Sequence, residues 1–233
     1  MNQLSLSQQA YENIKQKIVT LELPPGTVID ESNLQAELQV GRTPIREALQ
    51  RLAKEKLVVI IPRRGMFVSE IGITDLQRLF EVRLVLERLA VQLAAQRGTA
   101  VHWRQMQNVL DEVINQDPVT VNPERLPQID ANCHYIIYKA ADNAFLKDTL
   151  ATLYTLVLRL WYLYLAKLGD RTDAIVEYKH IIEHQNILDA LRQRNGDLAE
   201  QLMAEHIELY HSNIKAVMIG DSEESDTTQL TTV

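Results

Sequence analysis

The chain of 233 residues contains one cysteine, Cys133, so no disulfide can form within it. Such scarcity is typical of proteins that work in the reducing cytoplasm. The apolar runs are short beside the roughly 20 residues that a membrane helix needs, and the first residues show no signal-peptide pattern. We therefore expect a cytoplasmic protein with no membrane partner. Its length and its 46% hydrophobic residues are enough for one large or two small globular domains.

Basic residues are the minority charge, with 24 Lys and Arg against 31 Asp and Glu, which gives a net charge of −7. Their distribution is uneven. Residues 1–70 carry nine basic and eight acidic side chains, whereas the rest carries 15 and 23. Within 40–64 there are seven basic residues and two acidic ones. This local excess is typical of a nucleic-acid-binding segment, and the acidic remainder would suppress non-specific binding.

Residues 40–49 predict a turn followed by a helix. Gly41 supplies backbone freedom for the turn, Thr43 is a good N-cap, and Pro44 would take the first helical position. Arg42 and Arg46 lie at the exposed start of this helix. The apolar residues fall at helical spacing on one face: Ile45, Ala48, Leu49 and Leu52. A short helix with a buried stripe and a basic N-terminus is suited to reading the major groove of DNA.

The flanking segments complete a recognisable unit. In chain order, the helical part consists of a helix capped by Ser7, a break at 23–27, a helix over 31–39 capped by Asp30, and the helix over 42–55. Apolar runs at 57–61 and 66–68 follow, on either side of a turn at 62–65. Two helices joined by a short turn are in helix-turn-helix order. The two apolar runs predict a β-hairpin wing with arginines at its tip.

The remainder has no strand candidate and no internal repeat. We predict a linker at 71–75, with Thr74 capping the next helix, an all-helical domain over 76–219, and a disordered tail at 220–233 that is rich in Ser, Thr, Asp and Glu. The expected helices cover 76–96, 101–115, 128–140, 145–167, 173–194 and 197–218, with a loop at 117–127. The fold class is therefore mainly α: a winged helix-turn-helix followed by an antiparallel helix bundle.

Four polar residues of the predicted bundle could meet. Asp130 and His134 are four apart on one helix and so share a face. His184 and His206 flank the turn at 195–196, and at ~1.5 Å per residue they lie roughly 18 and 15 Å from it. In an antiparallel hairpin they would be nearly level. Three imidazoles and a carboxylate suit Zn²⁺, Ni²⁺ or a similar metal, with positions left open for a ligand.

Spacing alone leaves alternatives open. A histidine in a helix is more often a surface residue or a hydrogen-bonded core residue than a metal ligand. His180 also competes, because it precedes His184 by four residues, which is itself a ligand spacing.

The N-terminal segment closely resembles the DNA-binding domain of the GntR family of bacterial transcription regulators. The matching stretches are 23–27 (LPPGT), 41–49 (GRTPIREAL), Leu52 and 62–68 (PRRGMFV). The resemblance implies that Arg42, Thr43 and Arg46 contact bases or phosphates, and that Arg64 and Gly65 enter the minor groove.

Residues 75–218 resemble the FCD effector domain of the FadR subfamily. The matching stretches are 81–87, 130–134 (DANCH), 140–143 (AADN), 183–191 (EHQNILDAL), 196–197 and 203–207 (MAEHI). In the metal-binding branch of that family, the positions of Asp130, His134, His184 and His206 hold a divalent metal, and that of His180 does not. Zinc is the expected ion, with nickel or another transition metal as the alternative.

The combined resemblance implies a homodimeric, ligand-responsive regulator that binds a palindromic operator on double-stranded DNA in the bacterial cytoplasm and is nucleoid-associated when bound. The effector would be a small organic acid at the metal, with Arg83 as a second carboxylate anchor and Arg159 lining the pocket. Arg83 could equally pair with Glu87 one turn away, and Arg159 lies in an aromatic stretch typical of a core.

Two rival functions remain. One is a FadR-type regulator that senses another ligand without metal, as acyl-CoA-binding members do. The other is a mononuclear metalloenzyme, since a metal held by histidines can activate water. We predict that the chain is not an enzyme, because no general base is evident beside the site and an enzyme would not need an arginine-tipped wing.

Overall fold

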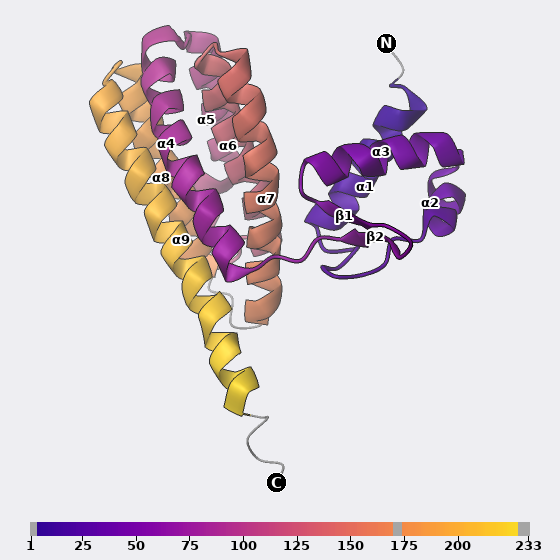
Figure 1. Ribbon diagram of the computed structural model, residues 1–233. Coiled ribbons are helices and arrows are strands. Elements are labelled where there is room, and N and C mark those ends of the chain that lie inside the picture. Colours follow the sequence, from indigo (N-terminus) through magenta and orange to yellow (C-terminus); the bar gives the residue numbers. More distant parts are fainter. Residues whose placement is uncertain (1–3, 170–173, 228–233) are drawn as a thin grey trace. The chain divides into compact units, whose positions relative to one another are not determined.

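The computed structural model describes residues 4–169 and 174–227. The chain divides into two compact units, residues 1–72 and 73–233, and each is described by itself (Figure 1). The first unit contains α1 (Leu6–Val19), α2 (Glu31–Leu38), α3 (Arg42–Lys54), β1 (Val58–Ile61) and β2 (Gly65–Val68). The two strands pair antiparallel, with Val58 opposite Val68 and Ile61 opposite Gly65. The predicted winged helix-turn-helix is therefore confirmed.

The buried face of α3 is the predicted one, but two predicted N-caps are wrong. Ser5, not Ser7, caps α1 and accepts a hydrogen bond from the backbone N–H of Gln8. The apolar period begins only at Ala10, so it could not distinguish the two serines. Helix α3 begins at Arg42 with Gly41 as N-cap, which places Thr43 and Pro44 inside the first turn. Proline is tolerated there because the first N–H groups of a helix have no intrahelical acceptor.

The wing is tied to the segment before α2. Val28 forms an isolated antiparallel bridge with Phe67, and the N–H of Ile29 donates to the carbonyl of Met66 over 2.8 Å. At the wing tip, Arg63 and Gly65 have φ values of 65° and 111°, so the hairpin turn uses left-handed backbone that favours glycine. The tip is thus held by β1, β2 and the chain before α2.

The second unit is the predicted helix bundle. Its elements are α4 (Ile73–Arg97), α5 (Ala100–Ile114), the 3₁₀ turn η1 (Pro123–Arg125), α6 (Leu126–Ala140), α7 (Ala144–Leu168), α8 (Ala174–Arg192) and α9 (Gly196–Thr227). Helix α4 packs along α9, α8 pairs with α9, and α6 lies against α4, α5 and α7. This arrangement places helices that are far apart in the sequence side by side in the bundle (Figure 1).

Two boundaries of this unit differ from the prediction, and a third cannot be compared. Helix α4 starts at Ile73, so Thr74 lies in its first turn and is not the cap. Residues 123–127 were expected in a loop but form η1 and the start of α6, where Asn122 caps η1 and Pro127 sits in the first turn of α6. The predicted start of α8 at residue 173 lies outside the described residues.

The predicted disordered tail at 220–233 overlaps the end of α9 and stays a prediction. Helix α9 continues to Thr227, and residues 228–233 lie outside the described part. Adding a residue to an existing helix avoids the cost of nucleation. The tail contains no proline after the last glycine, Gly220, so nothing in it stops the helix at once.

Helix α7 departs from the expectation that the apolar runs are short. By length and composition alone it could cross a membrane, with a mean hydropathy of 1.3 over its most apolar window. A core helix of a bundle passes the same test, and half of that window is buried inside the structure. Leu150, Val157 and Trp161 are among its core residues.

The turn between α4 and α5 gives a direct test of the packing. A Cβ atom added at Gly98 would lie 2.1 Å from the Trp103 ring and 2.6 Å from the carbonyl oxygen of Ala94. We expect Gly98→Ala to lower the free energy of unfolding by about 1–3 kcal/mol through overpacking, measured by denaturant unfolding. The control is Gly196→Ala, where the added Cβ would have only ordinary contacts, the nearest at 3.7 Å. Equal stability of the two variants would contradict the tight packing at Gly98.

Candidate metal centre and nucleic-acid interface

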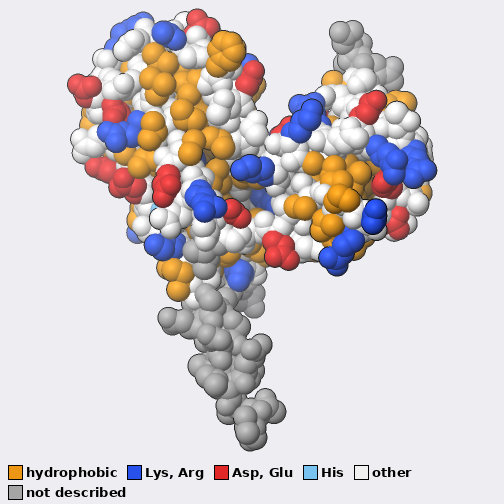
Figure 2. Space-filling model, in the orientation of Figure 1, with side chains coloured by type: hydrophobic (Ala, Val, Ile, Leu, Met, Phe, Trp, Pro, Cys, Tyr) orange, Lys and Arg blue, Asp and Glu red, His pale blue; other side chains and the backbone are white. Residues whose placement is uncertain are grey.

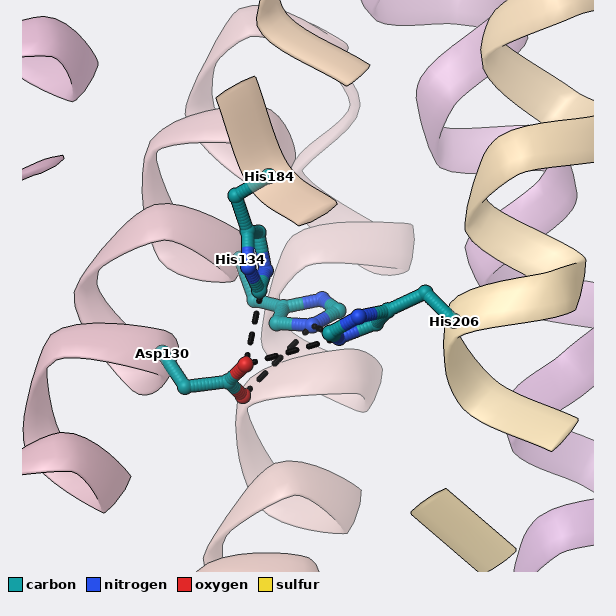
Figure 3. A group of neighbouring side chains, drawn as sticks. All are labelled: Asp130, His134, His184 and His206. Carbon is teal, nitrogen blue, oxygen red and sulfur yellow. Dashed lines mark hydrogen bonds and ion pairs between the residues drawn. The ribbon is translucent and has the colours of Figure 1, made fainter. Parts of the chain in front are cut away.

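Asp130 and His134 of α6, His184 of α8 and His206 of α9 converge inside the bundle (Figure 3). One ligand atom from each lies within 4.8 Å of the others, and all four residues are buried. The rings of His184 and His206 are 4.3 Å apart, as the residue count on either side of the 195–196 turn predicts. The structure therefore brings together the four residues selected from the sequence.

The separations between the donor atoms have the size that a metal polyhedron requires. Oδ1 of Asp130 lies 3.4 Å from Nε2 of both His184 and His206. Nε2 of His134 lies 3.6 Å from Oδ2 of Asp130 and 3.4 Å from Nε2 of His206. Bonds of about 2.0–2.1 Å in a tetrahedral site place neighbouring donors about 3.3–3.5 Å apart. The donor set therefore fits a transition metal such as zinc.

In each of the three imidazoles, the nitrogen that points away from Asp130, Nδ1, lies next to an oxygen atom. Nδ1 of His134 lies 3.2 Å from Glu87, Nδ1 of His206 lies 2.8 Å from Glu183, and Nδ1 of His184 lies 3.3 Å from the carbonyl of Ile181. An Nδ1–H that donates to such an oxygen leaves Nε2 unprotonated. All three Nε2 atoms then face Asp130 with the lone pair that a metal would use, which is how protein histidines are oriented as metal ligands.

Two polar atoms at the centre have no hydrogen-bond partner. They are Oδ1 of Asp130 and Nε2 of His184. Oδ2 of Asp130 accepts a hydrogen bond from the hydroxyl of Tyr154. Buried polar atoms are normally paired, so an unpaired carboxylate oxygen facing an unpaired nitrogen calls for an explanation. A bound cation would provide one.

The electrostatics of the centre favour an ionised carboxylate at Asp130 and a neutral imidazole at His184, whereas Asp130 and Glu183 outweigh burial and raise the pKa of His206. Burial alone would raise the pKa of Asp130, but His134, His184 and His206 outweigh it and hold that pKa well below its usual value. Burial, reinforced by the neighbouring His206, lowers the pKa of His184 well below its usual value. An anionic carboxylate beside a neutral imidazole is the protonation state in which both can bind a metal.

Arg83 forms the ion pair expected from the sequence and also lies beside the centre, while its role as a ligand anchor stays a prediction. Its Nε lies 3.2 Å from Oε1 of Glu87, so the ion pair exists. Its Nη2 lies 3.2 Å from Nε2 of His134, so the guanidinium also borders the centre. Glu87 further accepts a hydrogen bond from Tyr138. Arg159 is buried on α7, and burial lowers its pKa to about 10, which still leaves it positively charged at neutral pH.

His180 lies beside the four residues but is not one of them. Its ring stacks on that of His206 at 4.0 Å with an interplanar angle of 10°, and its Nε2 is 3.7 Å from Oδ1 of Asp130. It belongs to a second group of possible ligands, with Glu183 and His206.

The residues that surround the ligand set were largely missed from the sequence. Tyr138 follows His134 by four positions, so a helical-face argument could have found it. Tyr154 lies on α7, and only the packing of α7 against α6 brings its hydroxyl to Asp130. Glu183 precedes His184 by one residue, yet it contacts His206 on the next helix.

The first unit presents its arginines at the start of α3. The side chains of Arg42 and Arg46 are 67% and 48% exposed, and both approach Glu31 of α2, at 3.6 and 2.9 Å. Arg46 lowers the pKa of Glu31, outweighing the effect of burial. Thr43, Arg64 and Gly65 are exposed as well. The predicted DNA-contacting residues are thus accessible, two of them held by a carboxylate.

A winged helix-turn-helix joined to a helical bundle defines a DNA-binding transcription regulator. Comparison with known families agrees: residues 6–68 match the bacterial regulatory proteins of the gntR family, and residues 78–209 match the FCD domain. The chain belongs to the GntR family of transcription regulators, with an FCD domain, and is not an enzyme.

The relatives are full-length regulators. The chain is 25% identical over 222 residues to the HTH-type transcriptional repressor RspR of Escherichia coli K12, with 94% of this chain and 92% of that protein covered. It is 27% identical over 203 residues to the Nta operon transcriptional regulator of Aminobacter aminovorans, covering 87% and 91%. The solved structure of E. coli McbR/YncC has the same fold, with a TM-score of 0.76 at 20% identity over 91% of this chain and 98% of that one.

The buried pair of Arg83 and Glu87 predicts an asymmetric response to mutation. Arg83→Leu leaves the Glu87 carboxylate buried without its cation, and we expect the free energy of unfolding to fall by about 3–5 kcal/mol. Arg83→Leu/Glu87→Leu should lose less. The measurement is denaturant unfolding followed by the fluorescence of Trp103 and Trp161, the chain's two tryptophans.

The control for this prediction is Arg88→Leu, whose partner is Glu200 and whose side chain is 49% exposed. An exposed pair contributes at most about 1 kcal/mol. An Arg83→Leu variant as stable as Arg88→Leu would contradict the argument.

Proposed function

We propose that this regulator holds a divalent metal, zinc first, through Asp130, His134, His184 and His206. The observation that carries the proposal is the common orientation of the three imidazoles, each with Nδ1 on an oxygen and Nε2 toward Asp130. The metal would supply Lewis-acid positions for an anionic ligand. Residues 76–219 form the sensing domain in this proposal, and residues 1–70 the DNA-reading domain.

We propose a small organic acid as the effector. Arg83 lies at hydrogen-bond distance from His134, so its guanidinium can pair with a carboxylate at the metal. Arg159 contributes a second buried positive charge on α7. Binding would change the operator affinity through its differential interaction with two arrangements of the dimer.

On DNA, we propose that Arg42, Thr43 and Arg46 contact the major groove and its phosphates. Glu31 holds both arginines in the free protein, and phosphates would replace that carboxylate. Arg64 and Gly65 of the wing would enter the minor groove.

We also propose that the protein is a homodimer in the bacterial cytoplasm and reads a palindromic operator, because helix-turn-helix dimers bind two half-sites. Apolar side chains gather on the bundle surface over α4 (Figure 2). Val82, Val85 and Leu89 are exposed there at helical spacing, and a second copy would cover them.

The metal proposal is tested by metal analysis of the purified protein and of His134→Ala, His184→Ala and His206→Ala. We expect close to one equivalent of transition metal in the wild type and strong loss in each variant, because removing one ligand opens a buried site. Since a metal that binds only the folded state stabilises it, chelation should lower the melting temperature of the wild type and not of the variants.

The control for the metal analysis is His102→Ala, since His102 lies in the first turn of α5 and belongs to neither group of possible ligands. Unchanged metal content in all three ligand variants would reject the site. A wild type free of metal that still responds to a ligand would favour the metal-independent regulator.

The DNA proposal is tested on an operator selected from random-sequence DNA with the wild-type protein. We expect Arg46→Ala and Arg64→Ala to weaken binding by about 1–3 kcal/mol each if they contact bases, or to reduce the salt dependence if they contact phosphates. Fluorescence anisotropy at several salt concentrations measures both. Arg125→Ala, an exposed arginine of the second unit, is the control, and equal affinity of all three variants would reject the assignment.

A further inference from the structure

A second group of metal-binding side chains lies against the first. It consists of His180, Glu183 and His206, one ligand atom of each within 4.8 Å of the others. Oε2 of Glu183 is 3.4 Å from Nδ1 of His180 and 2.8 Å from Nδ1 of His206. The group shares His206 with the inner centre, and Nε2 of His180 is 3.7 Å from the inner ligand Asp130. The two groups are therefore continuous.

The two groups differ in their access to solvent. The inner ligands Asp130, His134, His184 and His206 are all at most 3% exposed. In the outer group the side chain of Glu183 is 34% exposed, while His180 is 7% exposed. A metal arriving from solvent can thus meet the Glu183 carboxylate before it reaches any inner ligand.

The outer donors have a recognised chemistry. Two imidazoles and one carboxylate on one side of an ion, with the remaining positions open, bind divalent transition metals. Nδ1 of His180 is buried, faces Glu183 and has no hydrogen-bond partner. This nitrogen is therefore available to an ion next to Glu183.

The shared ring makes the two groups alternatives. A neutral imidazole has one unprotonated nitrogen, so His206 can offer Nδ1 to an outer ion or Nε2 to an inner ion. When the ion moves inward, His206 releases the proton on Nε2 to water and takes one from water at Nδ1, and the new Nδ1–H donates a hydrogen bond to Glu183. The hydrogen bond from His206 to Glu183 in the structure corresponds to the inward arrangement.

We propose that His180, Glu183 and His206 form an entry site, which captures a divalent metal from solvent and passes it to the inner centre. This proposal rests on the metal centre proposed above. It gives His180 a role in loading, and it requires one ion per chain at equilibrium.

The test is the rate at which metal-free protein takes up Co²⁺ or Zn²⁺ from a chromophoric chelator. The variants are Glu183→Gln, which keeps an acceptor for His206 but removes the anionic ligand, and His180→Phe, which keeps a stacked ring but removes the nitrogens. Both should load about tenfold more slowly, a loss of the size that metal affinity shows when one group around a metal is removed. His180→Phe should still reach the wild-type metal content at excess metal, because His180 is not an inner ligand. The control is Glu205→Gln, an exposed carboxylate beside His206, which should load at the wild-type rate.

A second arm isolates the entry site. His134→Ala damages the inner centre, so it should retain a weakly bound Co²⁺ with the faint visible absorption of a solvated ion, and His134→Ala/His180→Phe should lose it. Wild-type loading rates in Glu183→Gln and His180→Phe would overturn the entry site and leave the inner centre standing. A wild type that binds no metal would overturn the proposed metal centre as well.

Discussion

The buried carboxylate of Asp130 is the constraint on which the bundle depends. An ionised carboxylate in a protein core is costly unless it is compensated, and here the compensation comes from three different helices. His134 shares α6 with Asp130, whereas His184 and His206 must be delivered by α8 and α9 at the same level. The relative positions of α6, α8 and α9 therefore depend on the charge of Asp130. A cation bound between Asp130 and the three histidines would stabilise those positions directly.

The surrounding residues extend the constraint to α4. Glu87 contacts His134 and pairs with Arg83, and both lie on the helix that begins at Ile73. That helix follows directly on the last residue of the first unit, Gly72. A ligand that draws Arg83 away from Glu87 would therefore act on the element nearest in sequence to the DNA-binding unit, which gives the proposed control a physical connection.

The DNA-binding unit uses its acidic residues in a comparable way. Glu31 contacts Arg42 and Arg46 at the start of α3. In the proposed DNA complex, phosphate groups would replace this carboxylate as the acceptor for the two arginines. The net negative charge of the chain is compatible with DNA binding because the positive charge is local.

Local patterns in the sequence predicted the helix-turn-helix, the wing and the bundle, and they placed Asp130 with His134 and His184 level with His206, because helical spacing fixes which residues share a face. The choice of His184 over His180 came from the resemblance to the FCD domain. Local patterns did not determine the N-caps Ser5 and Gly41 or the extent of α9, since several residues could cap or continue those helices. The roles of Tyr154, Glu183 and His180 were decided by tertiary structure alone. Their partners lie on other helices, and only the packing of α7, α8 and α9 against α6 sets which of their polar atoms meet the centre.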